Sequence, residues 1–316
     1  MKLARQLSEI PYDRNSVVTV GSFDGMHRAH QEILRETVHR ARRRSGRSIL
    51  ITFEPHPREI VGGQQGVELL TSLEEKQQVA RDFGIDLFFT AAFDYNFSRQ
   101  TSREFYKKYL IEGTGVSEVV EGFDHHFGRD REGSVREVQR LAQEFSFVSF
   151  ALEPFLIDNQ PVNSTRIREL LKMGDIVTAK RLLGRPYSVD GVVSRGNMRG
   201  RTLGYPTANI EVTPAKKLVP KDGIYFVRVL LGAETRFGIT SIGVRPTFEN
   251  NGQRIVEVYI LDFQADIYGH NIRVIFERRL RDEIRFASAE ELIVQMNRDK
   301  EESVQLKEQY QAAAIQ

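Results

Sequence analysis

Two histidines, His27 and His30, stand three residues apart in the segment GSFDGMHRAHQ (21–31), after an apolar run and before a helical pattern. Gly21 and Gly25 permit a tight turn there. The start of a helix offers free N–H groups and partial positive charge to a phosphate, and the spacing puts both rings on one face. Such imidazoles can donate hydrogen bonds to an α-phosphate as its charge builds during in-line attack. Surface histidines or a partial metal site are the alternatives.

Three further segments of the first half follow strands and carry groups that suit a nucleotide. They are FEPHP (53–57) with His56, EGFDHHFG (121–128) with Asp124, and NSTRIRELL (163–171) with Ser164, Thr165 and Arg168. The two hydroxyls can cap a helix and contact phosphate oxygens, and the arginine can neutralise leaving pyrophosphate. Each segment alone has a structural alternative: a helix cap, a turn proline or a surface arginine.

The second half contains a glycine-rich segment, GNMRGRTLGYPTANI (196–210), and no GxxxxGK[ST] loop, which excludes a P-loop kinase. Gly196 and the glycines after it let a loop close over phosphates, and Arg201 supplies charge. Thr207 and Asn209 present two neutral oxygens on the same side of an extended strand, which suits Mg²⁺. The alternative for the glycines is a hairpin.

Glu257 lies inside an otherwise apolar strand pattern, IVEVYILDF (255–263). A carboxylate in that position either faces solvent or is held for proton abstraction. By alternation it shares a face with Tyr259, which is compatible with a solvent-facing carboxylate and with a catalytic base.

The elements that must position these residues differ between the two halves. In the first half, helical patterns alternate with apolar runs at 17–21, 48–53, 86–93, 117–122 and 147–152. This indicates βαβ units and a parallel sheet, with the ligand at the carboxyl ends of the strands. The helical patterns are 31–44, 73–83, 102–111 and 135–145, followed by 164–173 and 175–183.

From Tyr187 onward the pattern alternates, with Gly and Pro between the runs, and no helix-length segment separates them. This favours an antiparallel sheet or a small barrel. A capping-box-like SAEE opens a final helix at 288–310. The sequence therefore predicts two domains, 1–184 and 185–316, of which the first is α/β and the second a β-structure with a C-terminal helix.

Composition excludes several classes of protein. Lys+Arg is 45 and Asp+Glu is 43, a net charge of +2 that argues against a protein that mainly coats nucleic acid or an anionic membrane. The absence of cysteine excludes disulfides and a thiolate site or nucleophile. Neither a signal-peptide pattern nor an apolar run long enough to span a membrane is present, so we expect a cytoplasmic protein.

Taken together, GSFDGMHRAHQ, FEPHP, GFDHHFG, NSTRIR, GRTLGYPTAN, SIGVRPTF and VEVYILDF resemble the bifunctional riboflavin kinase/FMN adenylyltransferases (prokaryotic FAD synthetases) along nearly the whole chain. The resemblance implies a Rossmann-like adenylyltransferase domain followed by a six-stranded antiparallel riboflavin kinase barrel. It also implies riboflavin, FMN, FAD and ATP as substrates or products, with Mg²⁺, and no nucleic-acid or membrane partner. How the chain assembles is left open.

The resemblance also implies roles for individual residues. In the kinase, Thr207 and Asn209 would bind Mg²⁺–ATP and Glu257 would take the proton from the 5′-hydroxyl of the ribityl chain. Loop residues Gly196 and Arg201 would lie over the phosphates, and Arg281 near the flavin phosphate. In the adenylyltransferase, His27 and His30 would stabilise the α-phosphate while the FMN phosphate attacks it. The other nucleotide-binding residues would be Gly21, Phe23, Asp24, Gly25, His56, Asp124, Ser164, Thr165 and Arg168.

Three residues depart from the family pattern: Ala29 replaces a glycine, Asn163 a serine and Tyr259 a histidine. The first two lie in the adenylyltransferase half, so a monofunctional kinase with an impaired first domain is one alternative. A cytidylyltransferase or pantetheine-phosphate adenylyltransferase would share only the first half. A flavin-sensing or RNA-binding regulator is the non-enzyme alternative, with the arginines of segment 40–47 as its nucleic-acid patch.

Overall fold

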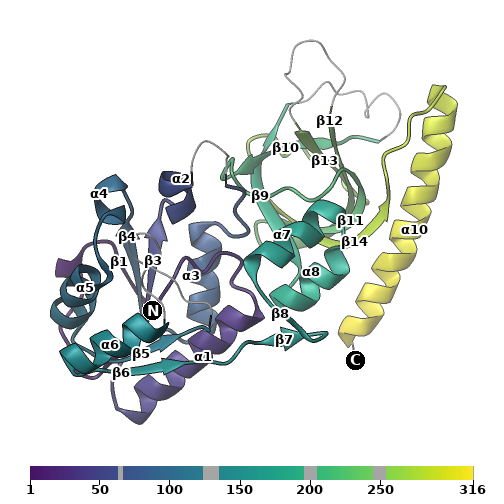
Figure 1. Ribbon diagram of the computed structural model, residues 1–316. Coiled ribbons are helices and arrows are strands. Elements are labelled where there is room, and N and C mark those ends of the chain that lie inside the picture. The colour runs from purple at the N-terminus through teal and green to yellow at the C-terminus, as the bar shows by residue number, and fades with distance from the viewer. Residues whose placement is uncertain (63–66, 124–134, 196–204, 245–253, 316) are drawn as a thin grey trace. The chain divides into compact units, whose positions relative to one another are not determined.

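The structure is a computed structural model that describes residues 1–62, 67–123, 135–195, 205–244 and 254–315 (Figure 1). It divides into two compact units, Met1–Ser164 and Thr165–Gln316. Helices α7 (Ser164–Met173) and α8 (Ile176–Leu183) thus pack mainly with the second unit, and α8 contacts strands of that unit. The functional boundary at 184–185 stays a prediction.

A sheet of six parallel strands forms the centre of the first unit, in the spatial order β1-β4-β3-β2-β5-β6. The strands are β1 (Lys2–Ala4), β2 (Ser16–Val20), β3 (Ser48–Glu54), β4 (Leu87–Ala92), β5 (Val116–Glu121) and β6 (Val148–Ala151). After β2 the chain adds β3 and β4 on one side and then crosses to add β5 and β6 on the other. A ligand is expected at the carboxyl ends of the two strands at this crossing, β2 and β5.

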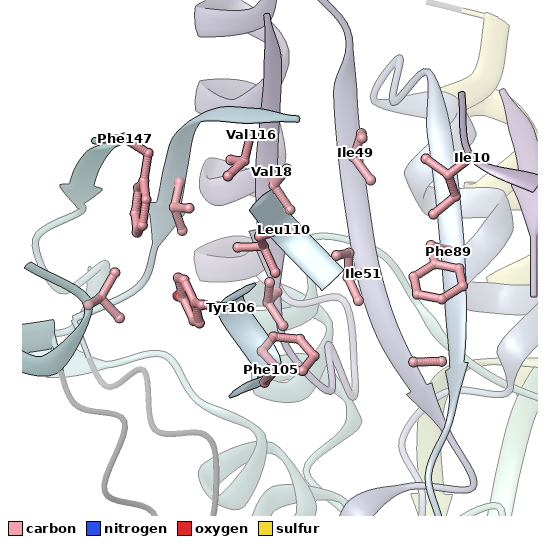
Figure 2. Packing of buried hydrophobic residues seen from close by; sticks show 14 of the residues in the cluster. Ile10, Val18, Ile49, Ile51, Phe89, Phe105, Tyr106, Leu110, Val116 and Phe147 are labelled. Atoms are coloured by element: carbon pink, nitrogen blue, oxygen red, sulfur yellow. The ribbon is translucent and has the colours of Figure 1, made fainter. Parts of the chain in front are cut away.

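Helices cover both faces of this sheet (Figure 1). They are α1 (Arg28–Arg43), α2 (Pro57–Val61), α3 (Leu73–Asp82), α4 (Tyr95–Ser98), α5 (Ser102–Phe105), the π-helical segment η2 (Tyr106–Glu112) and α6 (Val135–Phe145), with a short 3-10 turn η1 (Leu7–Glu9) before β2. Successive strand residues alternate between the faces: Val17 packs with Leu34 of α1 and Ala80 of α3, whereas Val18 packs with Leu110 of η2 and Leu141 of α6. Figure 2 shows the second of these clusters.

The second unit is built around a closed barrel of antiparallel strands in the order β10-β13-β12-β11-β14-β9. The strands are β9 (Tyr187–Ser194), β10 (Ala208–Thr213), β11 (Gly223–Leu231), β12 (Glu234–Val244), β13 (Arg254–Ile260) and β14 (Asn271–Arg281). Alternation sorts the side chains: Val256, Val258 and Ile260 of β13 are buried, while Glu257 and Tyr259 between them are half-buried on the opposite face. The long helix α10 (Ala289–Ile315) runs along the outside of the barrel (Figure 1).

Both predicted fold classes are confirmed. The predicted strands and helices of the first half match β2 to β6 and the helices α1, α3, α5–η2 and α6. The sequence did not reveal β1, which has only three residues, or the hairpin of β7 (Leu156–Ile157) and β8 (Gln160–Pro161). The residues of the turn between β7 and β8, Asp158 and Asn159, have φ of 54° and 55°, as a tight hairpin turn requires. Among the described residues no helix combines the length and apolar character needed to cross a membrane.

Candidate active sites

The loop between β2 and α1 has an unusual backbone. Phe23, Gly25 and Met26 have φ of 48°, 92° and 42°, so three of four consecutive residues adopt the left-handed region. Two of them carry side chains, and each such residue costs about 1–3 kcal/mol. At Gly25 a Cβ atom would also lie 3.0 Å from a methyl carbon of Leu70. This conformation persists only because surrounding contacts hold it.

Hydrogen bonds from distant parts of the first unit supply those contacts. Oδ1 of Asp24 accepts from the backbone N of Leu70 (2.9 Å) and of Thr71 (3.0 Å) and from Thr71 Oγ1 (3.2 Å). The N–H of Gly25 donates to the same hydroxyl at 2.9 Å, and Ser164 Oγ donates to the carbonyl of Asp24 at 2.8 Å. The Asp24 carboxylate therefore holds the loop, and its predicted contact with the nucleotide stays a prediction.

His27 and His30 come together at the start of α1, as the spacing predicted. His27 is the N-cap residue: its Nδ1 accepts from the backbone N of His30 at 3.3 Å. His27 is buried, and a neutral ring that accepts at Nδ1 carries its proton on Nε2, so Nε2 of His27 is a donor. The two rings stack with centroids 3.6 Å apart, and Phe23 contacts His30 edge-on at 5.1 Å. The predicted residue Phe23 thus supports the histidine pair from the core.

A metal site was the alternative for these histidines. Within the described ranges, no group of three or more His, Asp or Glu side chains is placed to hold a metal ion. The donor edge of His27 at a helix start is better suited to an anion.

His56, which follows β3, is positioned as His27 is, by capping the start of a helix with its ring. It caps α2, with Nδ1 accepting from the backbone N of Arg58 at 3.2 Å, and it is buried. β3 also reaches the strained loop, since Thr52 Oγ1 donates to the carbonyl of Ser22 at 3.3 Å. The ends of β2 and β3 are therefore linked at the carboxyl edge of the sheet.

The remaining predicted residues of the first site are only partly placed. Ser164 begins α7, and its hydroxyl donates a hydrogen bond to the carbonyl of Asp24 in the loop after β2. Thr165 and Arg168 lie on the same helix but in the second unit, so their approach to the histidines stays a prediction. Asp124 lies outside the described residues, as do Gly196 and Arg201 of the second site.

Lys76 was missed by the sequence reasoning. It lies in the first turn of α3 and is 2% exposed. Burial lowers the pKa of its ammonium group, and nearby carboxylates, Asp24 foremost, oppose that shift. The helical spacing could have predicted its burial, because Lys76 occupies the same helical face as Leu73 and the core residue Ala80. Its amine lies within electrostatic range of Asp24, a residue of the loop that precedes the histidines.

Glu121, the last residue of β5, is a second buried group that the sequence reasoning did not single out. It is 1% exposed, and its Oε1 accepts from Ser149 Oγ at 2.8 Å. Its other oxygen has no hydrogen-bond partner within the described part of the chain. Burial raises the pKa of this carboxyl to about 7, and the bond from Ser149 opposes the shift.

This carboxyl predicts a pH-dependent stability. The unfolded chain ionises Glu121 near its ordinary pKa of 4.5, whereas the folded chain keeps the proton up to about pH 7. Stability is therefore lost as the pH rises between those values, by on the order of 3 kcal/mol. Glu121→Gln lacks this loss, so its free energy of unfolding relative to wild type should rise between pH 4.5 and pH 8. Denaturant titrations followed by circular dichroism measure this, with the exposed Glu74→Gln as control. An equal difference at both pH values would contradict it.

In the barrel, the second set of predicted residues converges on one face. Thr207 Oγ1 donates to Glu257 Oε2 at 3.3 Å. Asn209 of β10 lies directly opposite Glu257 of β13, and Ser241 of β12 lies opposite it on the other side. Since the neighbouring Val256 is buried, this polar row lies on the outward face of the barrel. The arrangement offers a carboxylate flanked by neutral oxygens, which suits proton abstraction beside a magnesium–phosphate group.

Two tyrosines border this row. Tyr205, just before Thr207, packs edge-on against Tyr259 with ring centroids 5.2 Å apart. Its hydroxyl donates to Asn297 of α10. Tyr259, the residue that departs from the family pattern, thus forms an aromatic contact here.

Arg281 ends β14, and its guanidinium is engaged within the protein. Nε and Nη2 donate to the two carboxylate oxygens of Asp299 in α10, at 2.9 Å and 2.6 Å. Asp299 is 5% exposed, so the pair fastens α10 to the barrel. The predicted contact of Arg281 with the flavin phosphate stays a prediction, and it would require this ion pair to rearrange.

The basic segment at the end of α1 has internal partners. Arg40 and Arg44 form ion pairs with Glu118, which is 2% exposed. Arg40 also lies over the ring of Phe150 at 3.4 Å, and Arg47 donates to the carbonyl of Thr114 at 3.2 Å. Arg40 and Arg44 thus tie the end of α1 to β5, and Arg40 also ties it to β6.

The fold and the two sites define a class: an α/β nucleotidyltransferase unit followed by a flavokinase-type barrel. Family models agree, since FAD synthetase matches residues 9–166 and riboflavin kinase matches residues 183–307. A bifunctional riboflavin kinase/FMN adenylyltransferase from Pseudomonas fluorescens is 36% identical over 300 residues, covering 95% of this chain and 96% of the relative. One from Escherichia coli K12 is 34% identical over 303 residues, covering 95% and 96%. The chain belongs to the bifunctional riboflavin kinase/FMN adenylyltransferase family.

One solved structure has a similar fold over nearly the whole length of both chains. It is the crystal structure of a protein from Streptococcus pneumoniae named as a macrolide-efflux protein, with a TM-score of 0.84 and 30% identity, covering 95% of this chain and 97% of that one.

Proposed function

We propose that this chain phosphorylates riboflavin to FMN in its barrel and adenylylates FMN to FAD in its α/β unit, using ATP in both steps. The observation that carries this is that Asn209 and Glu257 lie opposite each other on adjacent barrel strands and that Thr207, directly before β10, donates to the same carboxylate, in a chain that also stacks His27 on His30 after β2. The family membership supports the same pair of reactions. The cytoplasmic location expected from the sequence stays a prediction.

In the adenylyl transfer, an oxygen of the FMN phosphate attacks the α-phosphorus of ATP, and pyrophosphate leaves. Nε2–H of His27, whose ring is fixed by the cap bond at Nδ1, would donate to an α-phosphate oxygen as charge builds there. His30 stacks on that ring and donates beside it. The α1 N-terminus adds its partial positive charge. No covalent protein intermediate is needed, because positioning and electrostatics suffice.

In the kinase, Glu257 accepts the proton of the ribityl 5′-hydroxyl as that oxygen attacks the γ-phosphorus, and ADP leaves. Thr207 Oγ1, 3.3 Å from the carboxylate, orients it. Asn209 and Thr207 would hold Mg²⁺, which would neutralise phosphate charge when bound; their neutral oxygens beside a carboxylate fit the oxygen ligands that this ion prefers.

A time course with the purified chain, riboflavin, ATP and Mg²⁺, with the flavins separated by chromatography, tests the proposal. We expect FMN to appear first and FAD to follow as FMN accumulates. FMN alone would mean that the first unit is impaired, in line with Ala29 and Asn163, or acts on another substrate. If neither product formed, both activities would be refuted and the flavin- or RNA-binding regulator would become the better hypothesis.

A further inference from the structure

We propose that Thr71 is a positioning residue for adenylyl transfer: its hydroxyl fastens the loop 21–27 and thereby sets the place of His27, 44 residues earlier in the chain. This inference rests on the proposed adenylyltransferase function of the first unit. Thr71 itself lies in no predicted motif, and its side chain is directed at the loop rather than at a ligand.

The hydroxyl of Thr71 makes two hydrogen bonds to the loop. It donates to Oδ1 of Asp24 at 3.2 Å and accepts from the N–H of Gly25 at 2.9 Å. Thr71 and Asp24 are each 1% exposed, so water does not have ready access to replace either bond. One hydroxyl therefore ties a side chain and a backbone amide of consecutive loop residues to the same point.

The loop needs this fastening because of its backbone. Phe23 and Met26 are held in the left-handed region on either side of the two fastened residues. Residues with side chains leave that region readily unless the surroundings determine it. Met26 is followed directly by His27, the N-cap residue of α1, so relaxation of the loop would move the imidazole that caps the helix.

Thr71 is a rigid anchor. The next residue, Ser72, is the N-cap of α3, with Oγ accepting from the N–H of Glu75 at 3.2 Å and its own N–H donating to Glu75 Oε2 at 2.7 Å. This capping box fixes the chain at Thr71. The buried ammonium of Lys76, one residue after Glu75, lies in the field of the Asp24 carboxylate.

A matched pair of substitutions separates the hydroxyl from the packing of the side chain. Thr71→Val keeps the shape and removes the hydroxyl, and Thr71→Ser keeps the hydroxyl and removes one methyl group. For Val we expect kcat of FAD formation to fall about 100-fold, as for a misplaced catalytic group, with the KM for FMN changed less than about threefold. For Ser we expect a kcat within about threefold of wild type. Riboflavin phosphorylation by the same molecules should stay unchanged because it takes place in the barrel, and a KM for FMN close to that of wild type reports that the first unit is folded.

Several outcomes would overturn the inference. A normal kcat in Thr71→Val would show that the hydroxyl does not position the site. A large loss in Thr71→Ser would show that packing, not the hydroxyl, matters, and this variant keeps the test decisive if the Val variant folds poorly. A rise in KM with unchanged kcat would indicate lost binding instead. If wild type itself made no FAD, the proposed function would fail, an outcome distinct from all three.

Discussion

Replacing Glu257 by Gln is expected to lower the rate of FMN formation by about 100- to 10,000-fold, while the same molecules still convert FMN to FAD at the wild-type rate. The amide is nearly the same size as the carboxylate but cannot accept the proton of the attacking hydroxyl. It can still accept the bond from Thr207, which lies 3.3 Å from Oε2, so the site should keep its shape. Initial rates of the two reactions, measured separately on one preparation, check this result.

Glu211→Gln is the matched control for this experiment. Glu211 is an exposed carboxylate on β10, the strand that pairs with β13, and it lies two residues from Asn209. Its replacement removes the same charge from the neighbouring strand without touching the polar row. A kinase rate near wild type in Glu257→Gln, or an equal loss in both variants, would refute the assignment of Glu257 as the base.

The second large effect concerns the histidine pair. His30→Ala should lower the rate of FAD formation by about 100- to 1,000-fold, the usual effect of removing one donor to a developing oxyanion, and leave riboflavin phosphorylation unchanged. The ring of His30 stacks on His27 at 3.6 Å and would donate beside it, whereas the cap bond to His27 comes from the backbone N–H of His30, which alanine keeps. Rates of FAD formation from supplied FMN and ATP measure the effect.

His27 requires a different substitution, because its ring also caps α1. His27→Asp keeps a side-chain acceptor that suits an N-cap and has no donor, so catalysis should fall with little change in helix stability. His39→Ala, at an exposed position on the same helix, is the control and should have no effect. If either active-site variant lowered both reactions together, the two sites could not be independent.

Much of the architecture followed from the sequence. The alternation of apolar runs with helical patterns predicted the parallel sheet, and the change of pattern at Tyr187 predicted an antiparallel sheet or a small barrel, of which the structure has the barrel. Those predictions succeeded because burial imposes a period on each element, and the period is visible within a single segment. The extended strand expected at Thr207 and Asn209 corresponds to β10, which begins at Ala208 and whose residues alternate between apolar and polar.

The motifs also identified which residues gather. His27 and His30 meet at the start of α1, and Thr207, Asn209 and Glu257 meet across β10 and β13. In the first case the spacing along one helix is enough. In the second, the resemblance to a known family supplied what the alternation of β13 left open, namely that the carboxylate faces the other two side chains.

The sequence by itself thus determined the two domains' fold classes, the family and the chemical groups at each site. Only the tertiary structure decided what those groups touch: the Asp24 carboxylate is directed toward Thr71, Arg281 is bound to Asp299, and Glu121 is buried with a raised pKa. The physical reason is that a period along the chain reports burial within one element. A hydrogen bond such as that from Ser164 to Asp24, 140 residues apart, depends on how separate elements pack, and no local pattern encodes it.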